Sequence, residues 1–301
     1  MPDKPRAEVT IDEGLVRMLL AEQAGGIYSA ALPVAHEADG WDCSVWRIGD
    51  AWAARLPRRS AAATLVINEQ QVLPAIAARV EPTGIRVPAP VICGAPAAGF
   101  RWPWSVVAWI EGSRGIDIPR AERSAWAEPL AAALGALHAA APDDYPPNPF
   151  RGVPLAARSD AVAQRLAHLK ADATLSEEDS DAAVSVWAKG LAAAPWTGPP
   201  VWIHGDLHPA NLVAQGPRLA GIIDFGDVTA GDPAYDLAVA WLAFDGEGRR
   251  RFIAATAGRY DDATWLRARA WSAAVALMLL AHSDDEPAYA ALGGEALAET
   301  V

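Results

Sequence analysis

The sequence predicts an α+β protein that begins with an antiparallel sheet of about five strands and continues as a mostly helical part. Three observations predict this class. Short apolar runs separated by turn dipeptides occupy the first third of the chain, and Ala- and Leu-rich segments with helical spacing follow. Two more apolar runs, near residues 201 and 219, each end on a polar loop. With 301 residues, 52% of them hydrophobic, and 13 Trp, the chain can form one large or two modest domains with a substantial core.

Composition excludes several classes of protein. No apolar run reaches the ~20 residues that a membrane-spanning helix needs, and the first residues lack the plan of a signal peptide. Two cysteines, Cys43 and Cys93, are too few for a disulfide framework, so we expect free thiols and a cytoplasmic protein. A formal net charge of −12 argues against nucleic-acid binding. That charge suits a cationic substrate, and it is equally well explained by solubility.

The first elements follow from caps, turns and periodicity. Thr10 and Glu13 have the spacing of a capping box, which predicts a helix that ends before Gly25. Asp-Gly and Gly-Asp turns then separate three strands, and two more strands follow a helix that Ser60 opens and Pro74 ends or kinks. The predicted strands are 32–37, 43–48, 51–56, 87–94 and 104–110.

After the sheet, apolar residues recur at helical intervals. Trp126, Leu130 and Leu134 share one stripe of a long helix, and a proline-rich stretch separates it from the next. Asp232 followed by Pro233 has the form of a helix N-terminus. The predicted helices are 120–141, 159–169, 177–194, one that starts at 232, 247–258, 263–283 and 286–298.

Polar residues at the ends of the apolar runs 201–203 and 219–223 suit phosphoryl transfer. This reaction needs a carboxylate that orients a hydroxyl group and accepts its proton, and Mg²⁺ that neutralises phosphate charge. Mg²⁺ prefers oxygen ligands and takes only a few of them from the protein. Asp206 can act as the base, while Asn211 and Asp224 can supply a neutral and a charged oxygen to the metal.

Two other interpretations of this stretch stay open. Gly, Asp, Pro and Asn favour turns for backbone reasons alone, so residues 205–211 can form an ordinary loop. His204, Asp206 and His208 also have the H-x-D-x-H spacing of a zinc site, which would make the protein a metal hydrolase. Against zinc, the remaining histidines lie in unrelated segments, and a further ligand is hard to find.

The sequence motifs of this stretch resemble those of known kinases. His-x-Asp-x-x-x-x-Asn at 204–211 followed by Asp-Phe-Gly at 224–226 is similar to the catalytic and metal loops of eukaryotic-like kinases. HGDLHPAN, IDFGD and GDPAYDLA together resemble the aminoglycoside phosphotransferase family, which includes macrolide kinases. The resemblance is most specific at 201–237. It implies a bilobal protein-kinase-like fold with an N-terminal nucleotide-binding lobe at 1–111 and a helical C-terminal lobe at 112–301 that holds the catalytic, metal and substrate sites.

The same resemblance places a nucleotide, ATP or GTP, between the lobes. Kinases hold its phosphates with a strand lysine that pairs with a helix glutamate, but no lysine lies between residues 5 and 169. Arg55 is expected to replace it, with Glu69 as partner, because Arg binds phosphate bidentately. Ser44 or backbone N–H groups of its hairpin would contact phosphate, and backbone groups from Ala108 to Ile110 would meet the base.

By resemblance, His204 and Asp236 are structural and bind backbone groups around the catalytic loop. Asp227 is the best candidate for contacting an ammonium group of a substrate, because it directly follows the metal loop. His208 is either packed within its loop or in contact with substrate. Further acidic residues that a cation can meet are Asp245, Glu247, Asp261, Asp262, Asp284, Asp285 and Glu286.

The sequence thus predicts a Mg²⁺-dependent O-phosphotransferase that moves the γ-phosphate of ATP or GTP to a hydroxyl group of a small molecule, as a monomer or homodimer. The negative charge and the family name favour an aminoglycoside-type antibiotic, which the reaction would inactivate. The Trp-rich composition leaves a macrolide open, and related folds leave a metabolic hydroxyl compound open. The missing lysine leaves open a nucleotide-binding regulator without catalysis.

Overall fold

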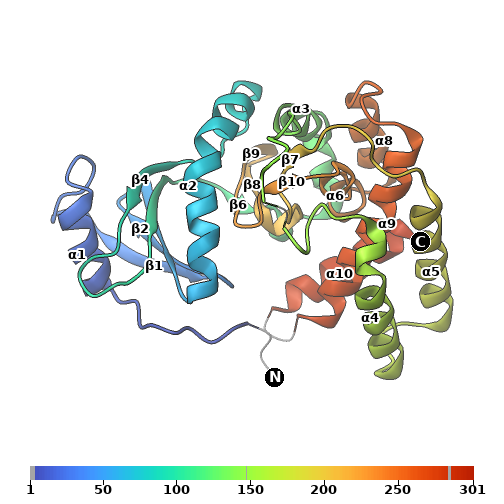
Figure 1. Cartoon of the computed structure of the whole chain (residues 1–301), viewed down its shortest axis with the longest axis horizontal. Helices are drawn as coiled ribbons and strands as arrows, with labels where there is room; N and C mark the ends of the chain where they lie inside the picture. Colours follow the sequence, from blue (N-terminus) through green and yellow to red (C-terminus); the bar gives the residue numbers. More distant parts are fainter. Residues whose placement is uncertain (1–3, 147, 284–285) are drawn as a thin grey trace.

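The computed structural model describes residues 4–146, 148–283 and 286–301. Its N-terminal part, at the left of Figure 1, contains a sheet that α1 (Glu13–Gln23) and α2 (Ser60–Val80) accompany. This sheet is antiparallel and five-stranded, with the strand order β1-β2-β3-β5-β4. The predicted sheet is therefore confirmed, and β2 has the predicted bounds. The strands are β1 (Val34–Asp39), β2 (Cys43–Ile48), β3 (Trp52–Pro57), β4 (Pro90–Gly94) and β5 (Trp104–Ala108).

Helix α1 (Glu13–Gln23) covers one face of this sheet, and its Leu19 is fully buried in the core that helix and sheet share. The predicted capping box is wrong. The N-cap is Asp12, whose side chain accepts a hydrogen bond from the backbone N of Leu15 at 2.8 Å. Asp caps a helix at least as well as Thr does, so the helix begins later than Thr10 would set it.

Helix α2 (Ser60–Val80) connects the sheet to the rest of the molecule. Pro74 lies inside this helix, which continues to Val80, so it does not end the helix. Leu73 and Ile76 belong to the large core of the C-terminal part. Glu69 lies about one turn before them, at the sheet. The helix that carries Glu69 is therefore anchored in the other half of the molecule.

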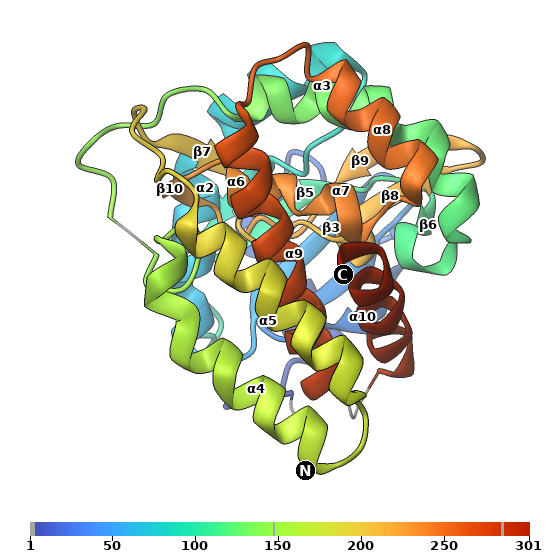
Figure 2. The ribbon, with the colours of Figure 1, turned by 90° about the vertical axis from the view of Figure 1, so that its right-hand side faces the viewer.

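The C-terminal part is mostly helical, as predicted. Helix α9 runs through its centre and packs against α5 and α10 (Figure 2). The segment predicted as one helix at 120–141 is instead a 3₁₀ helix, Arg120–Trp126, followed by α3, because Pro129 fits an α-helix only within its first turn. The helices are α3 (Ala127–Leu137), α4 (Ser159–Ala171), α5 (Glu177–Ala192), α6 (Ala234–Leu237), α7 (Val239–Leu242), α8 (Gly246–Ala255), α9 (Asp262–Ala281) and α10 (Pro287–Thr300).

Short strands in the C-terminal part hold the motif loops. β7 pairs with β10, and β8 pairs with both β6 and β9, all antiparallel. The sequence predicts β7 and β9 but misses the other three strands, which are only two to four residues long. These strands are β6 (Ser113–Arg114), β7 (Val201–Ile203), β8 (Leu212–Gln215), β9 (Arg218–Ile222) and β10 (Thr229–Gly231).

A short connection leads from the sheet to the helical part. β5 ends at Ala108, and Ser113 already pairs with Ala214 of the C-terminal part. Gly112 in between has φ +150°, and a Cβ there would lie 2.4 Å from the carbonyl O of Ala214. The lobe boundary between residues 111 and 112 stays a prediction, and it falls within this connection. Among the described residues, no helix is both long and apolar enough to cross a membrane.

Candidate active site

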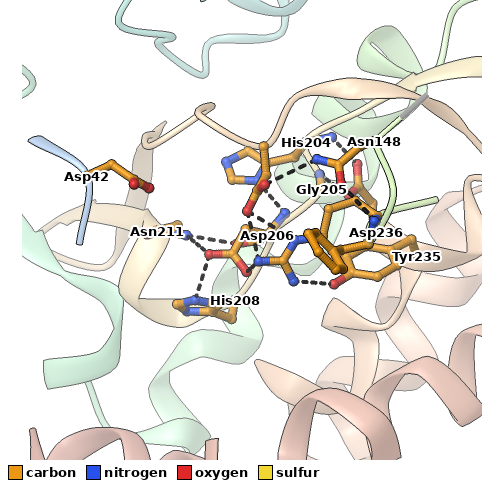
Figure 3. A network of polar contacts seen from close by, with 12 residues as sticks. Asp42, Asn148, His204, Gly205, Asp206, His208, Asn211, Tyr235 and Asp236 are labelled. Carbon is orange, nitrogen blue, oxygen red and sulfur yellow. Dashed lines mark hydrogen bonds and ion pairs between the residues drawn. The ribbon is translucent and has the colours of Figure 1, made fainter. Parts of the chain in front are cut away.

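The loop that carries Asp206 follows β7 and is held by a buried carboxylate. Asp236 accepts hydrogen bonds from the backbone N of His204 at 2.7 Å and of Gly205 at 3.0 Å (Figure 3). Gly205 has φ +83°, and a Cβ there would lie 2.3 Å from the carbonyl O of Asp227, so the turn requires glycine. The structural contact predicted for Asp236 is present.

His204 ties the loop that carries Asp206 to the loop that carries Asp224. Its Nε2 lies 2.9 Å from the carbonyl O of Ile223, to which it donates, and its Nδ1 accepts from the backbone N of Asp206 at 3.1 Å. Both ring nitrogens are thus engaged, and the residue is fully buried. His204 is not available as a zinc ligand, so the alternative H-x-D-x-H zinc site is wrong. Among the described residues, no group of three or more His, Cys, Asp or Glu is arranged to hold a metal ion.

The Asp206 carboxylate is contacted from several sides. Its Oδ2 lies 3.3 Å from Nδ2 of Asn211 and 3.5 Å from Nε2 of His208 (Figure 3). Its Oδ1 lies 3.3 Å from Nη2 of Arg151. Burial by itself would raise the pKa of Asp206, but the Arg151 guanidinium and His208 hold that pKa well below its usual range. Asp206 is therefore ionised at neutral pH and can accept a hydrogen bond from a hydroxyl group.

Asn211 and Asp224 offer oxygen atoms beside Asp206. The Nδ2 of Asn211 donates to the backbone O of Asp206 at 2.8 Å, which leaves the amide oxygen of Asn211 for another partner. The side chain of Asp224 is 58% exposed. Its backbone has φ +62°, a left-handed conformation that is uncommon outside glycine and occurs at functional turns.

Arg55 on β3 bridges two carboxylates. Its Nη1 donates to Glu69 at 2.7 Å and its Nη2 donates to Asp224 at 3.1 Å. The side chain of Glu69 is only 3% exposed, and this burial raises the pKa of Glu69, although Arg55 opposes the shift. The structure thus brings together Arg55 and Glu69 as the sequence predicts, and it adds the contact to Asp224.

A cleft of about 270 Å³ lies between the sheet and the C-terminal part. Its walls include Val45, Ala53 and Ile110, and Arg55 and Asp224 also line it. The apolar side chains suit a planar ring, and the charged ones suit its phosphates.

The connection after β5 exposes backbone groups to this cleft. The backbone N of Trp109 donates to the O of Ala51 beside β3 at 2.8 Å. Because alternate residues of a strand bond to opposite sides, the backbone groups of Ala108 and Ile110 face away from β3. β4, on that side, begins only at Pro90 opposite Val107, so these groups extend past its end.

Ser44 is not brought to the cleft. Cys43 and Val45 line the cleft, so the intervening side chain points to the opposite face of β2. Ser44 is 2% exposed, and its hydroxyl accepts a hydrogen bond from the indole N of Trp46 at 2.9 Å. The predicted contact between this side chain and phosphate is therefore wrong. The residues of this hairpin turn that line the cleft are Gly40, Trp41, Asp42 and Cys43.

Arg151 is the residue of the site that sequence reasoning missed. It lies in the proline-rich loop before α4 and belongs to no motif. Its Nε and Nη2 donate to Oδ2 of Asp227 at 3.0 and 2.8 Å, and its Nη1 donates to the hydroxyl of Tyr235 at 2.6 Å. Asn148 also donates to Asp227, at 3.2 Å. Asp227 is thus already paired with Arg151, although its side chain is 28% exposed, and its contact with an ammonium group stays a prediction.

Three of the other predicted substrate contacts, His208, Asp245 and Asp261, are also used internally. His208 is 5% exposed and packs its ring 5.8 Å from that of Tyr289, so its packed role is the one observed. Asp245 and Asp261 cap α8 and α9 through hydrogen bonds to backbone N–H groups. Asp284 and Asp285 lie outside the described residues.

The chain is similar in sequence and in fold to known kinases and phosphotransferases. The chain is 34% identical over 166 residues to a homoserine kinase of Methylorubrum populi, a match that covers 52% of this chain and 45% of that protein, so it spans less than half of the relative. A GDP and kanamycin complex of the phosphotransferase APH(2")-IIia superposes with a TM-score of 0.64 at 20% identity, covering 95% of this chain and 97% of the other.

The macrolide 2'-phosphotransferase MphH from Brachybacterium faecium gives a TM-score of 0.60 at 21% identity, covering 95% of this chain and 98% of the other. These structural likenesses establish a kinase-like fold. The profile of the phosphotransferase enzyme family matches residues 37–271, most of the chain. The protein therefore belongs to the phosphotransferase enzyme family.

Proposed function

We propose that the protein is a Mg²⁺-dependent O-phosphotransferase that moves the γ-phosphate of ATP or GTP to a hydroxyl group of a small molecule. One observation carries the proposal. Asp206, Asn211 and Asp224 come from two loops that His204 fastens together, and Asp224 lies at the wall of the cleft between sheet and helices. Phosphoryl transfer depends mostly on positioning and charge, and this arrangement supplies both.

In this proposal each residue acts through a specific atom. A carboxylate oxygen of Asp206 accepts the hydrogen bond of the acceptor hydroxyl, orients it towards the phosphate and takes its proton during transfer. The free amide oxygen of Asn211 and the exposed carboxylate of Asp224 would hold Mg²⁺, and both are hard oxygen ligands of the kind that this ion prefers. When bound, the ion neutralises charge on the transferred phosphate.

The nucleotide is proposed to lie in the 270 Å³ cleft. Backbone groups of Ala108 and Ile110 would hydrogen-bond its base, and Arg55, held by Glu69, would contact its phosphates. Neighbours of this fold have been solved with GDP or ADP bound, which supports a nucleotide donor. Backbone groups are the same whatever the side chains are, so these contacts do not show whether the base is that of ATP or GTP. Both nucleotides are therefore to be tested as donors.

For the acceptor, two candidates have support of different kinds. Aminoglycoside and macrolide phosphotransferases share the fold, which supports an antibiotic. The local match to a homoserine kinase supports a small hydroxylated metabolite. Asp227 is neutralised by Arg151, and Asp232 is paired with Arg267 at 2.7 Å. Because a polycation needs free carboxylates, this pairing favours the metabolite.

The test is nucleotide turnover in Mg²⁺ against a panel of hydroxylated amino acids including homoserine, aminoglycosides including kanamycin, and macrolides. We expect one acceptor class to raise turnover of ATP or GTP well above the rate without acceptor. Phosphorylated product, identified by mass spectrometry, would fix the reaction and the acceptor together. Nucleotide binding without turnover for any acceptor would instead indicate a regulator that does not catalyse, and absence of nucleotide binding would refute the kinase activity.

A further inference from the structure

The loop that delivers Arg151 is folded tightly against the loop after Asp224. The side-chain O of Asn148 accepts hydrogen bonds from the backbone N of Phe150 at 2.9 Å and of Arg151 at 3.2 Å, which closes a local turn. The backbone N of Asn148 donates to the hydroxyl of Thr229 at 3.3 Å, and its Nδ2 donates to Asp227 at 3.2 Å. Asn148 therefore both shapes this loop and fastens it.

Two glycines bring the backbones of these segments into contact. Gly152 has φ +64°, and a Cβ there would lie 2.7 Å from Cδ1 of Ile203. A Cβ on Gly231 would lie 2.8 Å from Cα of Gly152. The loop thus rests directly on β7 and β10, and Ile203 is the residue before His204, where the loop of Asp206 begins. A shift of this loop would be transmitted to Asp206 by direct contact.

The orientation of the Arg151 guanidinium is fixed by contacts other than its contact with Asp206. Two of its nitrogens engage Asp227 and a third engages the Tyr235 hydroxyl, so the planar group has one orientation. In that orientation Nη2 lies 3.3 Å from Oδ1 of Asp206, opposite the oxygen that Asn211 and His208 approach. The carboxylate of Asp206 is thus held from both sides.

We propose that Arg151 is a positioning residue for phosphoryl transfer, because it fixes the Asp206 carboxylate in the orientation that receives the acceptor hydroxyl. The inference rests on the proposed function. Arg151 acts through Asp206 and has no contact with the 270 Å³ cleft. Its pairing with Asp227 also cancels a second negative charge that would repel the Asp206 carboxylate. Displacement of a reacting group by about 1 Å is enough to slow a reaction by roughly 10²-fold.

The experiment compares Arg151→Gln with a matched control, Arg158→Gln. Arg158 follows in the same stretch and lies over the ring of Phe150, with its Cζ 5.2 Å from the ring centre, outside the cluster around Asp206. Turnover is measured at saturating nucleotide with the acceptor from the panel, or with water as acceptor, and nucleotide Kd is followed by Trp fluorescence. We expect Arg151→Gln to lower kcat about 10- to 100-fold, with nucleotide Kd within about 2-fold and Arg158→Gln like the wild type.

Two further variants separate positioning from a loss of folding. Tyr235→Phe removes only the hydroxyl that anchors Nη1, and we expect it to lower kcat about 2- to 5-fold in a folded protein. Arg151→Lys keeps the charge but cannot hold Asp227 and Tyr235 together, so its kcat should lie between those of wild type and Arg151→Gln. The inference would be overturned if Arg151→Gln had the kcat of the wild type. It would also be overturned if turnover by Arg151→Gln fell only in proportion to the fraction of the protein that is folded. If Asp206→Ala keeps full turnover, the proposed function itself fails, which is a separate result.

Discussion

Two arginines of this protein hold carboxylates at the candidate site, and they do so from different kinds of structure. Arg55 lies on β3, and its buried partner Glu69 lies on the next helix, 14 residues away. Arg151 lies in an irregular loop, and its partner Asp227 is 76 residues away. Arg55 serves the cleft proposed for the nucleotide, whereas Arg151 serves the carboxylate proposed to meet the acceptor. The regular pair can be predicted from sequence, and the irregular one is found only in the structure.

The carboxylate partners of the two arginines also differ in how deeply they are buried. The Glu69 side chain is 3% exposed and that of Asp227 is 28% exposed. A carboxylate in the interior that loses its partner costs far more than one near water. We therefore expect changes at the Arg55 pair to affect stability and nucleotide binding, and changes at the Arg151 pair to affect mainly the rate of transfer.

The largest effect is expected at Asp206, the carboxylate that Arg151 holds and that we propose as the base of the transfer reaction. Asp206→Ala removes the base and should lower kcat by about 10²- to 10⁴-fold, the usual contribution of general-base catalysis. Nucleotide Kd, measured by titration of Trp fluorescence, should stay close to that of the wild type because the residue lies outside the cleft lining. Loss of nucleotide binding in a folded Asp206→Ala protein would contradict this assignment.

The next effect is expected on stability at Arg55. Arg55→Gln leaves Glu69 buried without its cation, and breaking such a pair costs about 3–5 kcal/mol of unfolding free energy. Burial already raises the pKa of Glu69 above its unfolded value, and loss of Arg55 raises it further. A carboxyl with a raised folded-state pKa contributes stability that is lost as pH rises through that pKa, so the deficit should grow from pH 5 to pH 8.

Urea unfolding of Arg55→Gln at several pH values measures this deficit, with Arg47→Gln as the control. Arg47 also lies on the sheet, but its partner Glu111 is 67% exposed, so its loss should cost less than about 1 kcal/mol. Adding Glu69→Gln to Arg55→Gln should recover part of the stability, because the unpaired charge is removed. A deficit that does not change with pH would count against an ionised Glu69.

A third change tests whether the backbone of the Arg151 loop matters to the rate. Gly152→Ala introduces both a left-handed alanine and a clash with Ile203, whereas Gly216→Ala has a similar φ of +59° and open space around it. Each should cost about 1–2 kcal/mol from the backbone alone. Gly152→Ala should be less stable than Gly216→Ala and should also lower kcat. Equal kcat values in the two variants would show that the loop does not position Asp206.

Much of the fold follows from local patterns. The bounds of β2 are predicted to the residue because the turn dipeptides on either side fix its length, and the spacing of Asp206 and Asn211 identifies their loop. The three-residue strand β10 has no apolar run of its own and forms only because a distant strand, β7, pairs with it. Thr10 had the correct spacing for a cap, but Asp12 competes for the same backbone groups.

The residues of the site also divide into those that the sequence can predict and those that it cannot. Ser44 was foreseeable as a buried residue, because alternation along β2 places it on the face of Trp46, but a turn motif beside it suggested a phosphate contact. Arg151 gave no such signal. Its function in the cluster depends on a loop that packs through Gly152 and Gly231, and no periodicity or spacing in the sequence reports that two glycines touch.

The smallest effect is expected from Asp227→Asn, which removes the charge that anchors Arg151 but keeps the size of the side chain. Asn can still accept one hydrogen bond, and the pair is partly exposed, so the loss of stability should be about 1 kcal/mol or less. Arg151 keeps its bond to Tyr235, so kcat should fall only about 2- to 5-fold, less than in Arg151→Gln. The acceptor panel run on this variant also tests the cationic-substrate hypothesis. If Asp227 bound an ammonium group, KM for kanamycin would rise sharply, while KM for a polyol without an amino group, added to the panel as a control, would not change. Because Arg151 already occupies this carboxylate, we expect KM to change equally little for both.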